Sequence, residues 1–180
     1  MSHLPSMPDG NLLESFRQYP ELAVPLHEFA ERLMRGDCPL SAADREVIAV
    51  YISALNGCEF CRDSHAAALA HLDADAPPAD RLTDAAAADA VRPAMRPILA
   101  YVRKLNEAPT AIRQADVQAI LDAGWDERAV VYAGLVCGFF NLMNRWVEGL
   151  GFPSDPDLVP EAGRMLAADG YEAINRMLAR

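Results

Sequence analysis

The sequence feature that most constrains the fold is a long apolar segment from Ser41 to Gly57, followed at once by a second helical pattern over residues 58–72. Ser41, with Asp44 three residues later, resembles a capping box, which marks the start of a helix. Residues 47–52 could also form a short buried strand, but the cap, the length of the segment and the glycine at its end favour a helix. Two consecutive helices are therefore expected to meet at Gly57, which argues against a βαβ unit.

The rest of the chain carries similar helical signals. Alanine and leucine dominate and only 10 of the 180 residues are glycine, so the summed propensities favour helix. Apolar spacing and helix breakers predict further helices over residues 20–36, after Thr83 as far as Arg92, over 97–107, over 116–123, from Asp126 past Trp146, and in a tail over about 160–180. The length is about that of one domain. We expect an all-α protein with a single domain over residues 1–180.

The net charge of the chain and the sequence of its N-terminus restrict the partners and the compartment that we expect. The formal net charge is −10 and the 16 Lys and Arg residues form no basic stripe, so we expect neither nucleic acid nor an anionic membrane as a partner. The most apolar stretch, residues 129–140, is shorter than the roughly 20 residues that a membrane span needs. Residues 1–10 show no secretory signal pattern, so we expect a cytoplasmic protein. A reducing compartment keeps isolated cysteines free, so a close pair among the four needs another explanation.

Cys58, Cys61 and His65 form the pattern that carries chemistry. They lie at positions i, i+3 and i+7 of a helix that starts at Cys58, so they share one of its faces. The same face continues into Leu69 and Leu72, which indicates that the thiols are turned towards the core. At the first turn of a helix, unpaired amides and the helix dipole favour a thiolate and lower a cysteine pKa below about 8.5. We expect a reactive sulfur, with His65 able to exchange its proton.

Glu46 is a further candidate because it lies near the start of a helix that is apolar on nearly every side. Burial would raise its pKa towards the range of a general base. Stabilisation of the first helical turn by a negative charge explains the residue equally well. The residues alone leave both interpretations open.

A structural zinc site is the strongest alternative for the motif, because Cys-x-x-Cys followed by His supplies three possible ligands. A closed zinc site needs a fourth ligand, and Cys38, Cys137, His27 and His71 show no second metal-type spacing. We therefore expect these four residues to be structural and expect no metal cofactor.

The combined motif resembles a known family. Glu46, eleven intervening residues, then Cys58-x-x-Cys61-x-x-x-His65 is similar to the alkyl hydroperoxidase D-like and carboxymuconolactone decarboxylase-like family. The resemblance extends to its peroxidase-related branch through residues 100–105, 116–124 and 139–145, and covers about residues 20–155. It implies an alkyl hydroperoxidase D-like helical bundle that assembles as a homo-oligomer, commonly a dimer, trimer or hexamer.

The resemblance also implies a role for each site residue. Cys61 would be the thiolate that attacks the peroxide, Cys58 the resolving thiol, and Glu46 with His65 the proton relay. The redox-active Cys58–Cys61 disulfide would then need no other cofactor, and an external dithiol, carried by a lipoyl-bearing or thioredoxin-like protein, would reduce it. Some members have a histidine directly before the second cysteine, where this chain has Phe60. The decarboxylase branch works without the cysteine pair, which argues against that chemistry here.

Three hypotheses follow. The first is a thiol-dependent peroxidase, an oxidoreductase that reduces hydrogen peroxide or alkyl hydroperoxides. The second is a disulfide oxidoreductase or redox sensor with weak peroxidase activity, which the Phe60 departure would permit. The third is a non-catalytic helical oligomer whose cysteine pair binds zinc or is inert.

Overall fold

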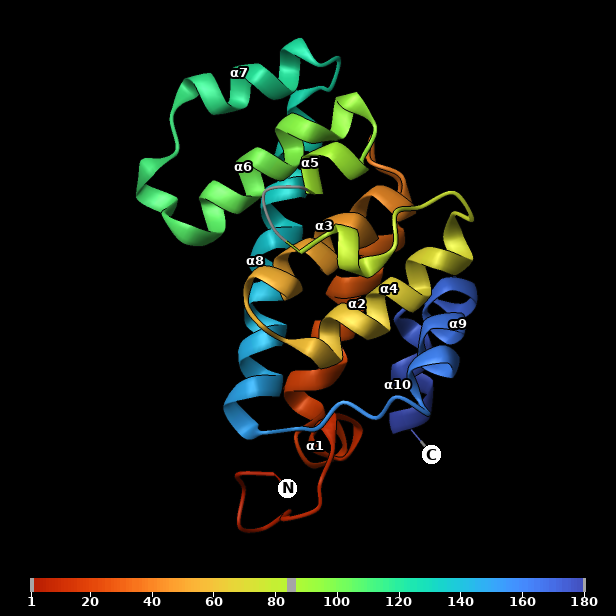
Figure 1. Cartoon of the computed structure of the whole chain (residues 1–180). Coiled ribbons are helices and arrows are strands. Elements are labelled where there is room, and N and C mark those ends of the chain that lie inside the picture. Colours follow the sequence, from red (N-terminus) through yellow and green to blue (C-terminus); the bar gives the residue numbers. More distant parts are fainter. Residues whose placement is uncertain (1, 84–86, 180) are drawn as a thin grey trace.

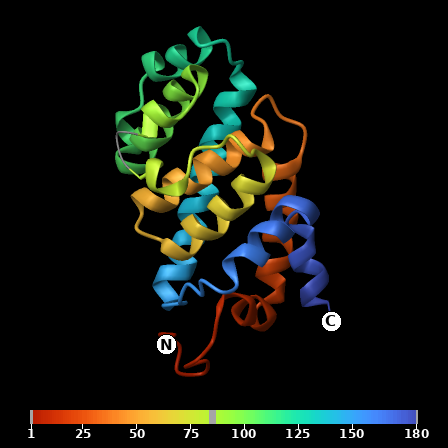
Figure 2. The same cartoon turned by 45° about the vertical axis from the view of Figure 1, so that its right-hand side comes forward.

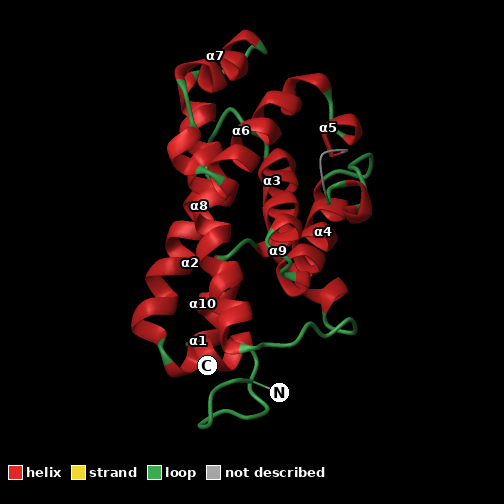
Figure 3. Cartoon of the chain, turned by 60° about the vertical axis from the view of Figure 1, so that its left-hand side comes forward, coloured by secondary structure: helices red, strands yellow, loops and turns green. Residues whose placement is uncertain are grey.

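The computed structural model describes residues 2–83 and 87–179 of the chain. The regular elements in these two ranges are all helical, which confirms the predicted all-α fold (Figure 1, Figure 3). The α-helices are α1 (Leu12–Gln18), α2 (Pro20–Arg35), α3 (Ala42–Leu55), α4 (Glu59–Leu72), α5 (Ala87–Ala90), α6 (Arg96–Glu107), α7 (Gln114–Asp122), α8 (Glu127–Leu150), α9 (Val159–Asp169) and α10 (Glu172–Leu178). Short 3₁₀ turns lie at Ala79–Arg81, Pro93–Met95 and Pro109–Ala111.

Helix α3 forms the centre of the bundle. All residues from Asp44 to Ser53 are buried, and α2, α4, α6 and α8 pack against it. The predicted capping box is confirmed, because Ser41 Oγ accepts the Asp44 N–H at 3.0 Å and the Asp44 carboxylate accepts the Ser41 N–H at 3.0 Å. Residues 47–52 are helical, so the alternative of a buried strand is wrong. Any carboxylate on α3 is therefore enclosed by protein.

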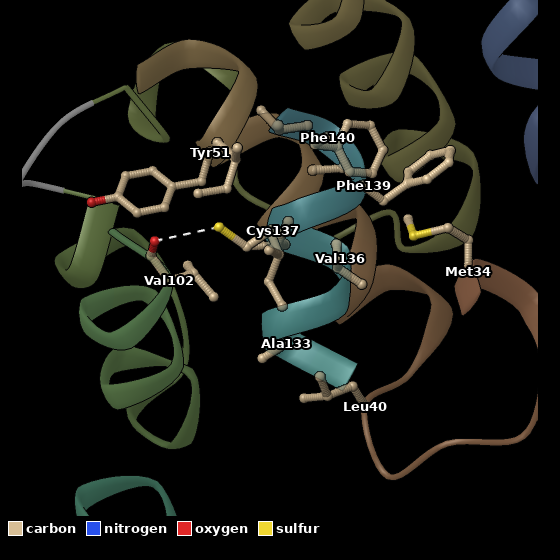
Figure 4. Packing of buried hydrophobic residues seen from close by; sticks show 14 of the residues in the cluster. Met34, Leu40, Tyr51, Val102, Ala133, Val136, Cys137, Phe139 and Phe140 are labelled. Carbon is tan, nitrogen blue, oxygen red and sulfur yellow. Dashed lines mark hydrogen bonds between the residues drawn. The ribbon is translucent and has the colours of Figure 1, made fainter. Parts of the chain in front are cut away.

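Helix α8 is the longest helix of the described chain. It begins after Asp126, whose carboxylate accepts the Ala129 N–H, and ends at Gly151 in the left-handed conformation. Figure 4 shows Val136 and Phe140 among the buried side chains that α8 contributes. By length and composition alone the whole of α8, Glu127–Leu150, could cross a membrane, although residues 129–140 by themselves are too short. Half of its most apolar window is buried inside the protein, however, as in the core helix of a bundle.

The predicted C-terminal tail forms two helices, α9 and α10, separated at Gly170. Helix α9 packs closely against α4, since a Cβ atom at Gly163 would collide with Ala67. Helix α10 packs against α2. In Figure 2 the blue α9 lies beside the yellow α4, and the darker blue α10 lies beside the red-orange α2. The tail therefore covers the helix that carries the cysteine motif.

The predicted helices differ from the structure in two places. The helix expected after Thr83 includes residues 84–86, which lie outside the described residues, and the described part forms only the four-residue α5 before the turn that Pro93 opens. Helix α1 was not predicted, although Asn11 and Glu14 form a complete capping box at its start.

Candidate active site

The two cysteines lie at the start of α4, where the sequence placed them. Gly57 joins α3 to α4 with φ +72°, a left-handed conformation that glycine adopts without steric cost. Cys58 is the N-cap residue of α4, and its N–H donates to the carbonyl of Ser53 at 2.9 Å. Cys61 follows in the first turn. Both cysteines therefore lie near the positive end of the helix dipole.

Both cysteines are free thiols and both are buried, with 0% of Cys58 and 3% of Cys61 exposed. Cys58 lies in a small apolar cluster with Val147 and Phe152. A hydrogen bond with the Cys61 side chain, together with burial, holds the pKa of Cys58 far above its ordinary value. Cys58 therefore keeps its proton at neutral pH.

Glu46 and His65 form a direct pair inside the bundle. The His65 Nδ1 lies 2.7 Å from Glu46 Oε2, and the Glu46 side chain is 0% exposed. The other carboxylate oxygen, Oε1, accepts a hydrogen bond of 2.7 Å from Arg35 Nη2. Each carboxylate oxygen of Glu46 therefore contacts a different basic side chain: Oε2 contacts His65 and Oε1 contacts Arg35.

The expectation that burial raises the pKa of Glu46 is wrong. Burial does oppose its ionisation, but attraction and hydrogen bonding from His65 and from Arg35 outweigh burial and lower the pKa below its ordinary value. Glu46 is therefore a carboxylate at neutral pH, hydrogen-bonded to His65. A buried carboxylate bound to a histidine is an arrangement also found in catalytic triads.

The Nδ1 contact with Glu46 and the packing against α8 fix the orientation of the His65 ring. Because Nδ1 faces the Glu46 carboxylate, the hydrogen-bond network assigns the proton to Nδ1 and leaves Nε2 free to accept one. The edge-to-face contact with Phe140, at 4.6 Å between ring centres, fixes the imidazole from α8. His65 follows Cys61 by one helical turn, which places their Cβ atoms about 5–6 Å apart.

Two further residues contact this pair, and sequence reasoning missed both. Arg35, at the end of α2, binds Glu46. The hydroxyl of Tyr171 lies 3.5 Å from Glu46 Oε1 and 3.5 Å from His65 Nδ1. Neither residue lies in the Glu-Cys-Cys-His motif, and no local pattern around either one signals these contacts.

Residues 20–104 match the model of the carboxymuconolactone decarboxylase family, and this range contains all four candidate residues. An uncharacterized peroxidase-related protein from Silicibacter sp. TM1040 has a similar structure, with 26% sequence identity, a TM-score of 0.74, and coverage of 81% of this chain and 76% of that chain. The match over residues 20–104 and this structural similarity support the alkyl hydroperoxidase D-like, carboxymuconolactone decarboxylase-like family. The predicted resemblance of the chain to this family is thereby confirmed.

A second structural relative supports the alkyl hydroperoxidase D-like fold. An alkylhydroperoxidase AhpD core from Ralstonia eutropha JMP134, also an uncharacterized peroxidase-related protein, has a TM-score of 0.76. It is 24% identical, and the alignment covers 83% of this chain and 78% of that chain. No curated protein matches the sequence. Tyr171 lies outside the residues that match the carboxymuconolactone decarboxylase family model.

The position at which some family members carry a histidine holds the half-buried Phe60. Phe60 packs against the apolar cluster around Cys58. It brings no titratable group to the two sulfurs. A titratable group near Cys58 comes instead from α8, where Glu148 hydrogen-bonds to the Cys58 side chain.

His27 and Cys137, two of the residues expected to be structural, have hydrogen-bond partners outside the site. His27 Nδ1 lies 3.2 Å from Asn175 Oδ1, and Cys137 Sγ donates to the carbonyl of Val102 at 3.6 Å (Figure 4). Over residues 2–83 and 87–179, no three His, Cys, Asp or Glu side chains converge as metal ligands. The zinc alternative has no geometric support in these ranges.

Proposed function

We propose that this protein is a thiol-dependent peroxidase that reduces hydrogen peroxide or alkyl hydroperoxides. The observation that carries the proposal is the buried Glu46–His65 pair, in which His65 lies on α4, one helical turn after Cys61 and on the helix that Cys58 caps. The match to this family and the similarity to peroxidase-related structures support it.

In the first step His65 Nε2 removes the proton from Cys61. The Cys61 thiolate attacks the outer oxygen of the hydroperoxide, the O–O bond breaks, and the departing alkoxide takes the proton from the His65 imidazolium. The products are a sulfenic acid on Cys61 and an alcohol, or water from hydrogen peroxide. Glu46 stays ionised throughout and stabilises the imidazolium that forms between the two proton transfers.

In the second step Cys58 attacks the sulfur of the Cys61 sulfenic acid. A disulfide forms, and the sulfenic hydroxyl leaves with the Cys58 proton as water. The raised pKa of Cys58 supports this order, because a protonated thiol does not compete with Cys61 for peroxide. An external dithiol, from a lipoyl-bearing or thioredoxin-like protein, then returns both cysteines to thiols.

The test is stopped-flow measurement of peroxide consumption with a supplied dithiol. We expect Cys61→Ser to abolish turnover and Cys58→Ser to stop after one peroxide, with a sulfenic acid that dimedone traps. Cys137→Ser is the matched control, because Cys137 is equally buried but binds the Val102 carbonyl outside the site. Turnover by Cys61→Ser at the rate of the parent would show that the nucleophile is wrongly assigned.

A disulfide oxidoreductase or redox sensor is the second candidate, and the apolar Phe60 beside Cys58 favours it. A direct comparison separates the two functions: exchange with a protein dithiol that is much faster than peroxide turnover would favour the second. The third candidate, a non-catalytic oligomer with a zinc-bound cysteine pair, predicts stoichiometric zinc in protein purified without chelators.

We also propose that the protein is a homo-oligomer. Three large apolar side chains of α8, Val131, Leu135 and Leu142, are 57%, 44% and 45% exposed. An exposed apolar helix face is typical of an interaction surface. Light scattering coupled to size exclusion gives the mass of the assembly, and a monomer at micromolar concentration would contradict this proposal.

A further inference from the structure

The C-terminal helices are attached to α2 next to the Glu46–His65 pair. Glu31 Oε2 accepts the N–H of Tyr171 at 2.6 Å and that of Glu172 at 3.4 Å, where α10 begins. Arg35, one turn further along α2, donates to the Leu166 carbonyl of α9 at 3.0 Å. Glu31 and Arg35, which bind the C-terminal helices, therefore lie on either side of the point where Tyr171 packs next to the Glu46–His65 pair.

Gly170 makes this entry possible. Its φ of +66° and ψ of −165° lie in a region that is essentially restricted to glycine. A Cβ atom here would also collide with the carboxylate of Glu31. The turn directs the Tyr171 side chain into the protein, where only 4% of the residue is exposed.

The ring and the hydroxyl of Tyr171 both contact the proton relay. The ring lies nearly parallel to the His65 imidazole, at 16° and 6.2 Å between centres, and the Arg35 guanidinium lies 5.2 Å from its centre. The hydroxyl is 3.5 Å from both Glu46 Oε1 and His65 Nδ1. Burial and the nearby Glu46 charge hold the pKa of Tyr171 well above its ordinary value, so the hydroxyl keeps its proton.

The hydrogen-bond directions leave one arrangement for this hydroxyl. His65 Nδ1 already donates to Glu46 Oε2 and cannot accept a second proton, so the Tyr171 hydroxyl donates to Oε1. Oε1 then accepts from both Arg35 and Tyr171, and Oε2 is left to His65. Two donors on one oxygen fix the rotation of the carboxylate and draw charge away from the oxygen that faces the imidazole.

We propose that Tyr171 is a positioning residue for the Glu46–His65 pair, and that α9 and α10 therefore complete the active site. The effect of Tyr171 on peroxide turnover depends on the proposed function, whereas the effect of Tyr171 on the His65 side chain does not. By donating to Oε1, the hydroxyl limits the attraction of Glu46 for a protonated His65. It thereby holds the carboxylate in the rotation that places Oε2 against His65 Nδ1.

The charged and titratable groups around the pair are few. Helix α2 presents Glu31 and Arg35, α3 presents Arg45 beside Glu46, and α4 presents Cys61. Helix α8 presents the uncharged Phe140. Deleting the Tyr171 hydroxyl removes a hydrogen-bond donor to Glu46 without removing a charge.

The test is an NMR titration of His65 in the full chain with Tyr171→Phe, which removes the hydroxyl and keeps the ring. We expect the His65 midpoint to rise by roughly 0.3–1 pH unit, as the loss of one long hydrogen bond to a carboxylate implies. In parallel, the acidic limb of the peroxide rate shifts upward by the same amount, while the plateau changes little. Tyr132→Phe is the control, because it removes a hydroxyl from α8 beside Arg128, and its His65 midpoint stays at the parent value.

Fluorinated tyrosine at position 171 gives a second measurement of opposite sign. Fluorine makes the phenol a stronger donor without changing the fold, so the His65 midpoint falls. An unchanged midpoint with fluorotyrosine, or an unchanged or lowered one in folded Tyr171→Phe, overturns the proposal. A parent protein without peroxidase activity but with both shifts would refute the proposed function and leave the role of Tyr171 standing.

Discussion

Replacing Glu46 with glutamine tests the central ion pair most directly. The substitution keeps the shape of the side chain but removes the charge between Arg35 and His65, whose side chains are 12% and 11% exposed. Removing one partner of a buried ion pair typically costs about 3–5 kcal/mol. Arg35 keeps hydrogen bonds to the carbonyls of Met34 and Leu166, so the lower end, about 3 kcal/mol, applies here.

The loss appears as a lower free energy of unfolding in urea and a lower melting temperature. For a chain of this length about 3 kcal/mol corresponds to a shift of roughly 6–12 °C. Peroxide turnover falls as well, because a neutral amide stabilises the His65 imidazolium less than a carboxylate does. Both quantities are measured on one preparation at pH 7.

The pH dependence of this difference has a defined sign. The pKa of Glu46 is lowered in the folded protein, so its contribution to stability is fully present above the unfolded value of about 4.5. The contribution is lost as the pH falls through the lower folded pKa. The difference in unfolding free energy between parent and Glu46→Gln is therefore constant from pH 7 to about 5 and shrinks below that.

Glu161→Gln is the matched control, because Glu161 pairs with Arg164 at the exposed surface of α9. Its loss should not change the stability beyond the error of the measurement. Our account of the site would be refuted if Glu46→Gln were as stable as the parent at pH 7. If the difference in unfolding free energy between parent and Glu46→Gln stayed constant down to pH 3, only the inference that the pKa of Glu46 is lowered would be refuted.

Three further outcomes are expected. Gly170→Ala destabilises the protein by about 1–3 kcal/mol, measured by urea unfolding, because alanine is strained at the conformation of this residue; an unchanged midpoint would show that the turn adapts. Phe140→Ala, which removes a fully buried ring beside His65, costs about 3–5 kcal/mol in the same assay, and a cost below 1 kcal/mol would mean that the site collapses around the gap. Iodoacetamide at neutral pH modifies Cys61 before Cys58, since the pKa of Cys58 is raised; peptide mass spectrometry that finds Cys58 labelled first would reverse their roles.

The parts of the site that are close in sequence could be predicted. The capping box at Ser41, the glycine at position 57 and the spacing of Cys58, Cys61 and His65 are all local signals, and the structure confirms the helices they predict. The approach of Glu46 to His65 follows from two helices that meet at Gly57, because such helices pack antiparallel over their length. Family resemblance named the same residues.

The parts that depend on distant packing could not be predicted. Arg35 reaches Glu46 only because α2 packs on α3, and Tyr171 is 125 residues away from Glu46 in the sequence. The direction of the Glu46 pKa was wrong because burial was foreseen, whereas the strength of its pairing with His65, and the second partner Arg35, were not. A buried carboxylate without known partners has an undetermined pKa, because burial and pairing act in opposite directions.

The burial of both sulfurs separates the two halves of the proposed cycle. A peroxide is small enough to reach Cys61 at the first turn of α4, although only 3% of this residue is exposed. A dithiol carried on a protein must bring its sulfur into line with the disulfide, and the cluster around Cys58, which includes Val147 and Phe152, blocks that approach. Reduction by such a partner therefore has to begin at Cys61 or displace this cluster. We expect a small dithiol to reduce the oxidised protein readily. Reduction by a protein-borne dithiol should become faster when Phe152→Ala opens the cluster. Equal reduction rates in parent and variant would show that the partner enters at Cys61.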